Sequence, residues 1–496
     1  MTQLRGDSLS ALGAGIAVPG YRRDQVSVGI VHFGVGGFHR SHQAMYLDQL
    51  MNAGQAMDWG ICGVGLLPGD RQMSEVMRNQ DCLYTLVLKR ADGTWQPRVI
   101  GSIVDYLFAP DDPEAVLARL TSATTRLVSL TITEGGYNID LTGRFVPDAP
   151  AVAADLTSGA APRTVFGFIV EALARRRALG LAPFTVLSCD NIQGNGHVAE
   201  HVITAFARLR DPELAEWIAS TVDFPNSMVD RITPATTDAD RAEVTRRFGA
   251  EDEWPVLCEP FKQWVLEDSF RAGRPPFEAV GVQLVTDVEP YELMKLRLLN
   301  AGHQALAYAG YLAGYRLVHE AAQDPLITDF LLTYMSEEAV PTLQPVAGID
   351  LPQYCRELVE RFSNPEVRDT VARLCGHTSD LIPKFLLPVL RRQLDLGGPI
   401  ERATTVLACW ARYAEGVDEQ GEPIDVVDAL KDRLMASARK QADEPLAFLE
   451  NRDVFGDLVD DERLAATYLK ILASLHVHGV RETLLRSARK TPLAMR

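Results

Sequence analysis

Val28-Gly-Ile-Val-His-Phe33, followed by Gly34-Val-Gly-Gly-Phe-His-Arg40, is the stretch of sequence that decides the fold. A short apolar run that leads into glycines and then into a helix-prone segment predicts a strand, a tight turn and a helix. Glycines in such a turn let a pyrophosphate approach the backbone, where amides at the helix start can donate to it. The candidate cofactor-binding residues of this turn are Gly34, Gly36, Gly37, Phe38, His39 and Arg40.

The turn departs from the usual G-x-G-x-x-G pattern at one position. His39 replaces the third glycine, so a glycine-rich turn that binds no nucleotide stays an alternative. A helix at about residues 41–51 and a strand at 59–66 follow, and Asp70 comes soon after that strand. A carboxylate in this place reads the ribose hydroxyls of NAD. Arg71 beside it could instead receive the 2′-phosphate of NADP, so we expect NAD without excluding NADP.

Two further strands end at residues that could bind a ligand. Strands are predicted at 127–133 and 184–191, each after a helix, at 112–120 and 164–177. Gly135 and Gly136 follow the first of these strands, and Asn191 ends the second. Open α/β sheets bind ligands at the carboxyl ends of their strands, where the Asn191 amide could donate to a substrate oxygen. An Asx turn that caps the next element is the alternative for this residue.

The last part of the N-terminal half contains a segment at 224–234 that is bounded by prolines and carries Asp230 and Arg231. We predict a loop there. Strand-like runs at 256–258, 264–266 and 280–285 complete this half. The alternation of strands and helices predicts an α/β class, with a Rossmann-type NAD-binding domain at residues 1–286.

The stretch from Tyr291 to Leu306 sets an amine, an amide and an imidazole into an apolar helix. Lys295, Asn300 and His303 fall on one broad face if each residue turns the helix by about 100°. A buried lysine is costly in its charged form, so a lysine that is neutral near pH 7 is a candidate general base. The alternative is a lysine whose ammonium reaches the surface beside a structural histidine.

The remaining sequence has almost entirely helical spacing. Apolar residues recur with this spacing at 306–315, 326–338, 354–362, 367–374, 404–415, 426–440 and 461–476. The pattern predicts a mainly α-helical substrate and catalytic domain at residues 287–496. Arg373 and Lys384 are notable cations in an acidic chain, and either could simply interact with a helix dipole.

Composition argues against several classes of partner. The chain has 496 residues and a net charge of −17, so we expect neither nucleic acid nor an anionic membrane as a partner. Its seven cysteines are scattered, which indicates reduced thiols and no structural zinc site. We predict no signal peptide and no membrane span, and expect a cytoplasmic protein that is a monomer or a small homo-oligomer.

Five motifs in order resemble the polyol-specific long-chain dehydrogenases, and within this family the mannitol 2-dehydrogenases. The motifs are residues 34–40, 131–137, 188–191 and 228–234, and the set Lys295-x4-Asn300-x2-His303. The resemblance covers nearly the whole chain. It implies a Rossmann-type first domain, a mostly helical second domain, and an active site in the cleft between them that uses no catalytic metal.

The resemblance also implies catalytic roles for four residues. Lys295 would be the general base that takes the hydroxyl proton during alcohol oxidation. Asn191 and Asn300 would hold the substrate oxygen and stabilise its alkoxide character. His303 would orient the substrate through hydrogen bonds to its hydroxyls.

Four more residues would lie around the substrate. Asp230 matches a family position near it, and Glu292 precedes the base closely enough to influence the exit of its proton. Arg373 and Lys384 would reach the distal hydroxyls of the polyol. At a family position that holds a lysine, this chain has Leu381, so the distal part of the pocket differs.

The resemblance implies the reversible oxidation of D-mannitol to D-fructose with NAD. Relatives that oxidise D-arabinitol or D-sorbitol, or reduce fructuronate, share most of the motifs and stay open. The family pattern has an acidic pair after the second strand, where this chain has Gly69 and Asp70, so the resemblance implies NAD without excluding NADP. A non-catalytic NAD-binding sensor is the alternative of another class, and the presence of Lys295 argues against it, because a sensor needs no base.

Overall fold

The structure, a computed structural model, describes residues 2–13, 15–140, 143–157, 159 and 161–488. It consists of two compact units, Met1–Glu289 and Pro290–Arg496. The functional boundary that the sequence predicts, between residues 286 and 287, remains a proposal. All seven cysteines are described, and each is buried and free.

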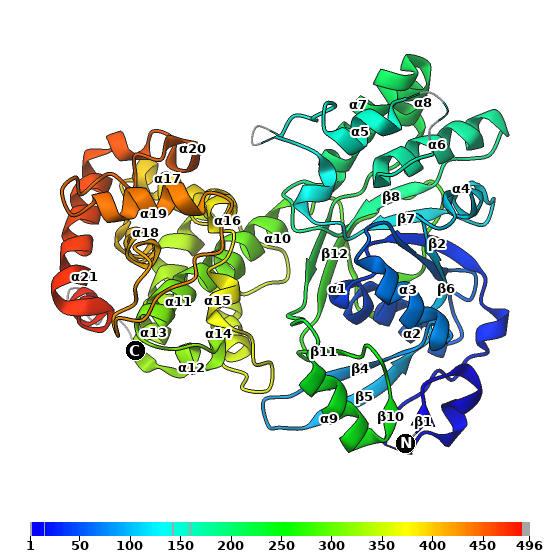
Figure 1. Ribbon diagram of the computed structural model, residues 1–496, viewed down its shortest axis with the longest axis horizontal. Coiled ribbons are helices and arrows are strands. Elements are labelled where there is room, and N and C mark those ends of the chain that lie inside the picture. The colour runs from blue at the N-terminus through cyan, green and yellow to red at the C-terminus, as the bar shows by residue number, and fades with distance from the viewer. Residues whose placement is uncertain (1, 14, 141–142, 158, 160, 489–496) are drawn as a thin grey trace. The chain divides into compact units, whose positions relative to one another are not determined.

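A five-stranded parallel sheet forms the middle of the first unit (Figure 1). The strands, in the order in which they lie side by side, are β6 (Ile103–Phe108), β3 (Gly60–Gly65), β2 (Val28–Phe33), β7 (Leu127–Leu130) and β8 (Thr185–Ser188). After β2, the chain first adds β3 and β6 on one side of it and then β7 and β8 on the other side. The switch point therefore lies between β2 and β7, and the predicted Rossmann-type class is confirmed.

Helices cover both faces of this sheet, as a parallel sheet requires. One face packs against α4 (Pro113–Thr121), α6 (Val165–Ala178), α7 (Asn195–Arg210) and α8 (Pro212–Thr221), and the other against α2 (Gln43–Asn52) and α3 (Asp70–Asn79). Val31 and Phe33 enter the first core and Ile30 the second. Because successive side chains point into two different cores, β2 is a continuous apolar run.

Among the described residues, three smaller sheets complete the first unit. The smallest pairs β1 (Thr2–Gln3) with β10 (Ala250–Glu251), and the other two have three strands each. One contains β11 (Val256–Cys258), β4 (Tyr84–Lys89) and β5 (Trp95–Ile100), and the other β13 (Gln283–Val285), β12 (Gln263–Glu267) and β9 (Ser227–Asp230). The loop predicted at 224–234 is wrong, because β9 pairs antiparallel with β12 and is buried throughout. A strand of four residues with two polar side chains and flanking prolines carries too little period-2 signal to be recognised.

Every element of the second unit is helical in the part of the chain that the structure describes, which confirms the predicted class. The α-helices are α10 (Glu289–Met294), α11 (Ala301–Leu312), α12 (Val318–Gln323), α13 (Pro325–Thr333), α14 (Leu351–Phe362), α15 (Val371–Leu374), α16 (Thr378–Phe385), α17 (Leu387–Leu396), α18 (Glu401–Ala414), α19 (Lys431–Lys440), α20 (Arg452–Phe455) and α21 (Glu462–Ala488). Among the described residues, no helix is long and apolar enough to cross a membrane.

Two of the predicted helices are interrupted by π-helical turns. These are η5 (Lys295–Asn300), between α10 and α11, and η6 (Tyr334–Ala339), after α13. In a π-helix each backbone hydrogen bond spans five residues instead of four, so one turn holds more residues than an α-helical turn. The continuous α-helix predicted from Tyr291 onward is therefore wrong at Lys295–Asn300, which includes two of its three polar candidates, while His303 lies in the α-helix α11.

Candidate active site

The glycine turn joins β2 to α1 (Gly37–Ser41) at the switch point of the parallel sheet. Gly34 has a φ of +93°, and a Cβ there would lie 2.0 Å from the Thr131 carbonyl oxygen, so only glycine fits. A Cβ on Gly36, in contrast, would meet no atom closer than 3.9 Å. The space beside Gly36 is open, which is the arrangement that the close approach of a pyrophosphate requires.

His39 stands where the usual pattern has its third glycine. That glycine normally allows the helix to pack closely on the strand. Here the buried His39 ring stacks on the His32 ring of β2, with ring centres 3.4 Å apart. Burial lowers the pKa of His32 to about 3 and that of His39 well below its usual range, so both rings are neutral near pH 7. The contact between helix and strand that a glycine normally allows is therefore made here by the stacked rings of His39 and His32.

Phe38, which is half-buried, and Arg40, which is buried, support the turn. The Phe38 ring stacks on His42, with ring centres 4.9 Å apart. Arg40 is buried, and its guanidinium donates to the carbonyl oxygens of Gly36 and Trp254. These contacts hold the glycine turn in place, and the direct cofactor contacts of both side chains stay a prediction.

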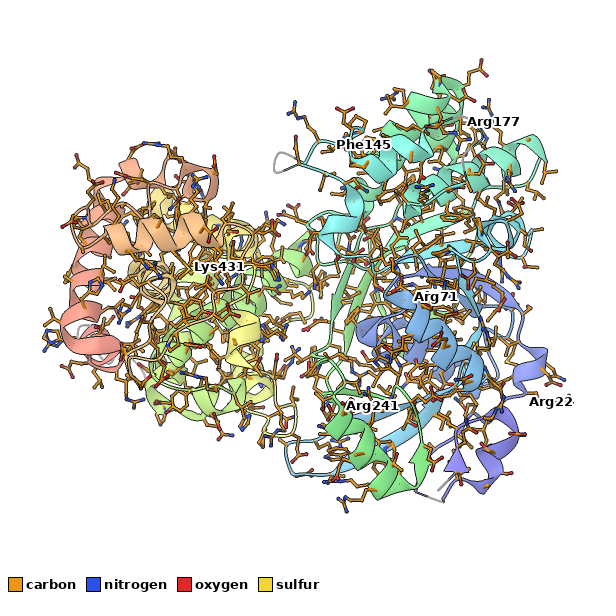
Figure 2. All side chains as sticks on the ribbon, in the orientation of Figure 1. Arg22, Arg71, Phe145, Arg177, Arg241 and Lys431 are labelled. Carbon is orange, nitrogen blue, oxygen red and sulfur yellow. The ribbon has the colours of Figure 1, made fainter. Side chains whose placement is uncertain are left out.

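Asp70 opens α3 directly after β3. One of its carboxylate oxygens accepts hydrogen bonds from the backbone amides of Leu66 and Leu67, both at 2.8 Å, so Asp70 fixes the end of the strand. Arg71, which projects from α3 (Figure 2), donates to Asp111 at 2.7 and 3.2 Å. The guanidinium that could have received a 2′-phosphate is thus paired with a carboxylate at the surface.

A buried carboxylate, to which the sequence alone gave no role, holds the turn after β7. Asp190 accepts hydrogen bonds from the amides of Thr133 and Ile132, at 2.8 and 3.2 Å, and from the Tyr137 hydroxyl at 2.8 Å. Thr133 has a φ of +60°, an unfavourable value for a β-branched residue. Burial raises the pKa of Asp190 above its usual value. In the sequence, the position of Asp190 at the end of a predicted strand, beside Asn191, could have identified it as a functional residue.

The strand β9 delivers Asp230, which is buried at its carboxyl end. The next residue, Arg231, is also buried and donates to the carbonyl oxygens of Ser41, at 2.6 Å, and of Glu259, at 3.0 and 3.1 Å. Ser41 ends α1, so Arg231 ties β9 to the helix that follows the glycine turn. Strand β9, which carries Asp230, is therefore held by its pairing with β12 and by the hydrogen bonds of Arg231.

In the second unit, Lys295 opens η5 and Asn300 ends it. Lys295 is 6% exposed. In an α-helix two residues five apart point about 140° away from each other. In a π-helix the hydrogen bond itself spans five residues, so residue i+5 lies little more than one turn beyond residue i. The π-helix therefore aligns Lys295 and Asn300 better than the predicted α-helix would.

The other candidates near the base lie in the flanking helices. Glu292 is buried in α10, one turn before Lys295. The His303 ring in α11 packs on Phe362, with ring centres 4.3 Å apart. The side-chain oxygen of Asn300 is buried and has no hydrogen-bond partner among the described residues. Such an atom costs about 1–3 kcal/mol unless something else binds it, which suits an oxygen that accepts a hydrogen bond from a ligand or a water.

The two candidate cations of the second unit are exposed and paired. Arg373 forms an ion pair with Asp369, and Lys384 donates to Asp380 at 2.8 Å, each acid standing four residues earlier. Leu381 lies half-buried on α16, about one turn before Lys384. These contacts agree with the simpler alternative of surface cations, and their role toward a substrate stays a prediction.

A cavity of about 940 Å³ lies beside α18 and α21 of the second unit. None of the predicted site residues lines it, so this cavity is separate from the candidate site. Within the described ranges, no group of three or more His, Cys, Asp or Glu side chains could hold a metal ion.

Comparison with protein families matches the two parts of the chain separately. Residues 28–279 match the mannitol dehydrogenase Rossmann domain, and residues 287–475 match the mannitol dehydrogenase C-terminal domain. The mannitol 2-dehydrogenase of Phaeosphaeria nodorum is 47% identical to 98% of this chain, over 86% of its own length. That of Aspergillus fumigatus is 46% identical over 96% of both chains.

Two solved structures share the fold along the whole chain. The mannitol 2-dehydrogenase of Pseudomonas fluorescens, in a ternary complex with NAD and D-mannitol, is 44% identical with a TM-score of 0.92, covering 99% of this chain and 100% of that one. A D-sorbitol dehydrogenase in substrate-free form is 38% identical with a TM-score of 0.89, covering 97% and 100%. The resemblance inferred from the five motifs is confirmed, and the chain belongs to the mannitol dehydrogenase family.

Proposed function

We propose that this protein is an NAD-dependent oxidoreductase that interconverts D-mannitol and D-fructose. The observation that carries the proposal is the match, over 99% of the chain, to a mannitol 2-dehydrogenase whose solved structure holds NAD and D-mannitol. The family therefore supports the activity that the five motifs predicted. The roles of the cofactor-binding and catalytic residues rest on the motifs and on the local geometry of each unit.

The first unit fits NAD. Gly34 leaves no room for a side chain, while the space beside Gly36 is open to the pyrophosphate. One carboxylate oxygen of Asp70 holds the amides that follow β3, and the second would accept from a ribose hydroxyl. When bound, NAD supplies the acceptor for the hydride that leaves C2 of the polyol.

The second unit supplies the base. The Nζ atom of Lys295 would take the proton of the C2 hydroxyl during oxidation and return it during ketose reduction. Burial favours the neutral form of an amine, which is the form that accepts a proton. The side-chain amides of Asn191 and Asn300 would donate to the same oxygen as negative charge develops on it. Loss of one such donor costs about 3–4 kcal/mol in other enzymes.

The remaining candidates would orient the substrate or move the proton. His303, whose ring is fixed by Phe362, would hydrogen-bond to a neighbouring hydroxyl. Asp230 would act on the site through its charge, and Glu292 would pass the proton from the base toward solvent. Arg373 and Lys384 would bind distal hydroxyls only after release from their aspartate partners, which makes theirs the weaker assignments.

D-sorbitol is the second candidate substrate. The D-sorbitol dehydrogenase of known structure is 38% identical along almost the whole chain. Leu381 stands at a position where the family pattern has a lysine, so contacts to the distal end of the polyol differ. D-Arabinitol and a uronate remain alternatives. We place the protein in the cytoplasm, because its reaction would draw on the NAD of the cell and its cysteines are free. A monomer or small homo-oligomer stays an expectation.

The function is tested by following NADH formation with D-mannitol, D-sorbitol and D-arabinitol in separate assays, each with NAD and with NADP. We expect the highest kcat/KM with D-mannitol and NAD, together with NADH-dependent reduction of D-fructose. A higher kcat/KM with D-sorbitol would keep the mechanism and change the substrate. The absence of activity with every polyol and both cofactors would contradict the proposal and favour a uronate reductase or a sensor.

A further inference from the structure

The π-helix that carries the proposed base is in contact with a second π-helix. Tyr334 opens η6, and its fully buried hydroxyl donates a hydrogen bond of 3.2 Å to the Arg297 carbonyl oxygen in the middle of η5. The two segments lie against each other within the second unit. Isolated π-helical turns are rare and tend to occur at functional sites, so support for η5 from outside its own backbone calls for an explanation.

The Ala301 amide, which would donate to the Arg297 carbonyl in an α-helix, donates elsewhere in this structure. The amide of Ala301 donates to the carbonyl oxygens of Leu296, five residues back, and Leu298, while the following element, α11, is α-helical. The spacing of the backbone hydrogen bonds thus changes from five residues to four between η5 and α11. The Arg297 oxygen lies beside this change, and the Tyr334 hydroxyl serves it. Left unpaired in the interior, such an oxygen would cost about 1–3 kcal/mol.

The Arg297 side chain makes a second connection to the same neighbour. Its guanidinium donates to the carbonyl and hydroxyl oxygens of Thr342, at 2.7 and 3.1 Å. Thr342 belongs to a short turn, Val340–Thr342, that follows η6 directly. Both the backbone and the side chain of one η5 residue are thus held by a single continuous segment, 334–342.

That segment is itself anchored in the core of the second unit. The Glu338 carboxylate in η6 accepts the amides of Arg402 and Ala403 at the start of α18, at 2.6 and 2.8 Å. The Gln393 amide of α17 donates to the Glu338 carbonyl at 2.5 Å. Tyr334 therefore presents its hydroxyl to η5 from a fixed support.

We propose that Tyr334 is a positioning residue, whose hydroxyl keeps η5 in its π-helical form and thereby holds Lys295 and Asn300 in the same direction. The proposal rests on the function proposed above for these two residues. Without the hydroxyl, an α-helical ladder that pairs the Arg297 carbonyl becomes competitive. In that ladder the two side chains would diverge by about 140°, and the base and the amide could not both reach one substrate oxygen.

Tyr334→Phe tests the proposal, because it removes the hydroxyl and keeps the ring. Tyr308→Phe is the matched control, since Tyr308 is equally buried in α11 and donates to Thr378 at 2.6 Å, without contact to η5 through this bond. Both variants lose one buried hydrogen bond, so similar decreases in thermal stability are expected. Hydrogen exchange of the amides at 295–301 should become faster in Tyr334→Phe than in Tyr308→Phe.

The catalytic consequence is measured on the same samples. Tyr334→Phe should lower kcat for polyol oxidation about tenfold, equivalent to roughly 1.4 kcal/mol of transition-state stabilisation, and shift the apparent pKa of the kcat profile. NADH affinity should be unchanged, and Tyr308→Phe should keep the kcat and the profile of the unmodified protein. Equal exchange rates at 295–301 in the two variants would overturn the proposal, as would equal kcat values. A protein that oxidises no polyol would refute the proposed function, while the exchange comparison would still decide the role of Tyr334.

Discussion

At the scale of single residues, Asp70 combines two roles that a substitution can separate. One oxygen holds the Leu66 and Leu67 amides, and the negative charge would repel a 2′-phosphate. Asp70→Asn keeps an oxygen that can accept the two amides and removes the charge. We expect the ratio of kcat/KM with NADP to kcat/KM with NAD to increase about tenfold or more, because about 1.4 kcal/mol of discrimination is a factor of ten.

Asp70→Ala is the comparison for this measurement. It removes the charge and also the hydrogen bonds that fix the end of β3, so the thermal stability of the protein should fall with Ala and stay nearly unchanged with Asn. An unchanged cofactor ratio in Asp70→Asn would show that the ribose is read elsewhere in the first unit.

The types of the site residues could be predicted from the sequence, but their partners could not. A carboxylate after a second strand and a lysine in an apolar helix are visible as residue types at a known spacing. The pairing of Arg71 with Asp111 joins residues forty positions apart, and the unpartnered oxygen of Asn300 depends on what packs around it. Such contacts depend on tertiary structure, which one sequence does not display.

At the scale of elements, the two glycines of the turn should respond differently to one added methyl group. Gly34→Ala would force a positive φ on alanine and a clash with Thr131, so we expect a large loss of thermal stability or no folded protein. Gly36→Ala meets no protein atom closer than 3.9 Å and has a φ of −97°, so the protein should fold with nearly unchanged stability.

The same Gly36→Ala variant should bind cofactor poorly. The added methyl group would occupy the space that the pyrophosphate needs, so the Kd for NADH, measured by fluorescence titration, should increase at least about tenfold. Normal NADH affinity in a stable Gly36→Ala variant would mean that the pyrophosphate does not approach the turn at this glycine.

Elements were predictable where they repeat a strong local pattern. β2 matches the predicted range because six residues buried on both faces form one apolar run, and α6 begins as predicted because Thr164 caps it, its hydroxyl accepting from the Gly167 amide at 3.0 Å. η5 was not predictable, because a single wider turn leaves the apolar spacing of Leu296, Leu298 and Leu299 compatible with an α-helix.

At the scale of the whole molecule, acid should destabilise the first unit. Burial lowers the pKa of both His32 and His42 to about 3 in the folded chain, against an ordinary value of about 6.5 when unfolded. Between these values the unfolded chain binds protons that the folded chain does not. The free energy of unfolding therefore falls as pH decreases from about 6.5 toward 3, by up to about 1.4 kcal/mol per pH unit for each histidine.

Urea unfolding at several pH values between 7 and 4 measures this effect. His42→Phe keeps an aromatic ring beside Phe38 and Trp264 and removes one titrating group, so its stability should depend less steeply on pH than that of the unmodified protein. Identical slopes for the two proteins would contradict the assignment of a low pKa to His42.

The organisation of the whole chain was the most predictable property. Five motifs in a fixed order predicted the family, the Rossmann-type sheet and the helical second unit, because order along the chain is itself sequence information. The roles of Asn191, Lys295 and Asn300 are not contained in that order, and they remain proposals.

The most direct test of the proposed mechanism is the kcat of NAD-dependent D-mannitol oxidation by Lys295→Ala, measured together with its Kd for NADH. If Lys295 is the general base, kcat should fall by about 10²–10⁴ while the Kd for NADH stays nearly unchanged, because the base acts in the chemical step and not in cofactor binding. A variant that folds, binds NADH and turns over D-mannitol at the rate of the unmodified protein would contradict the mechanism.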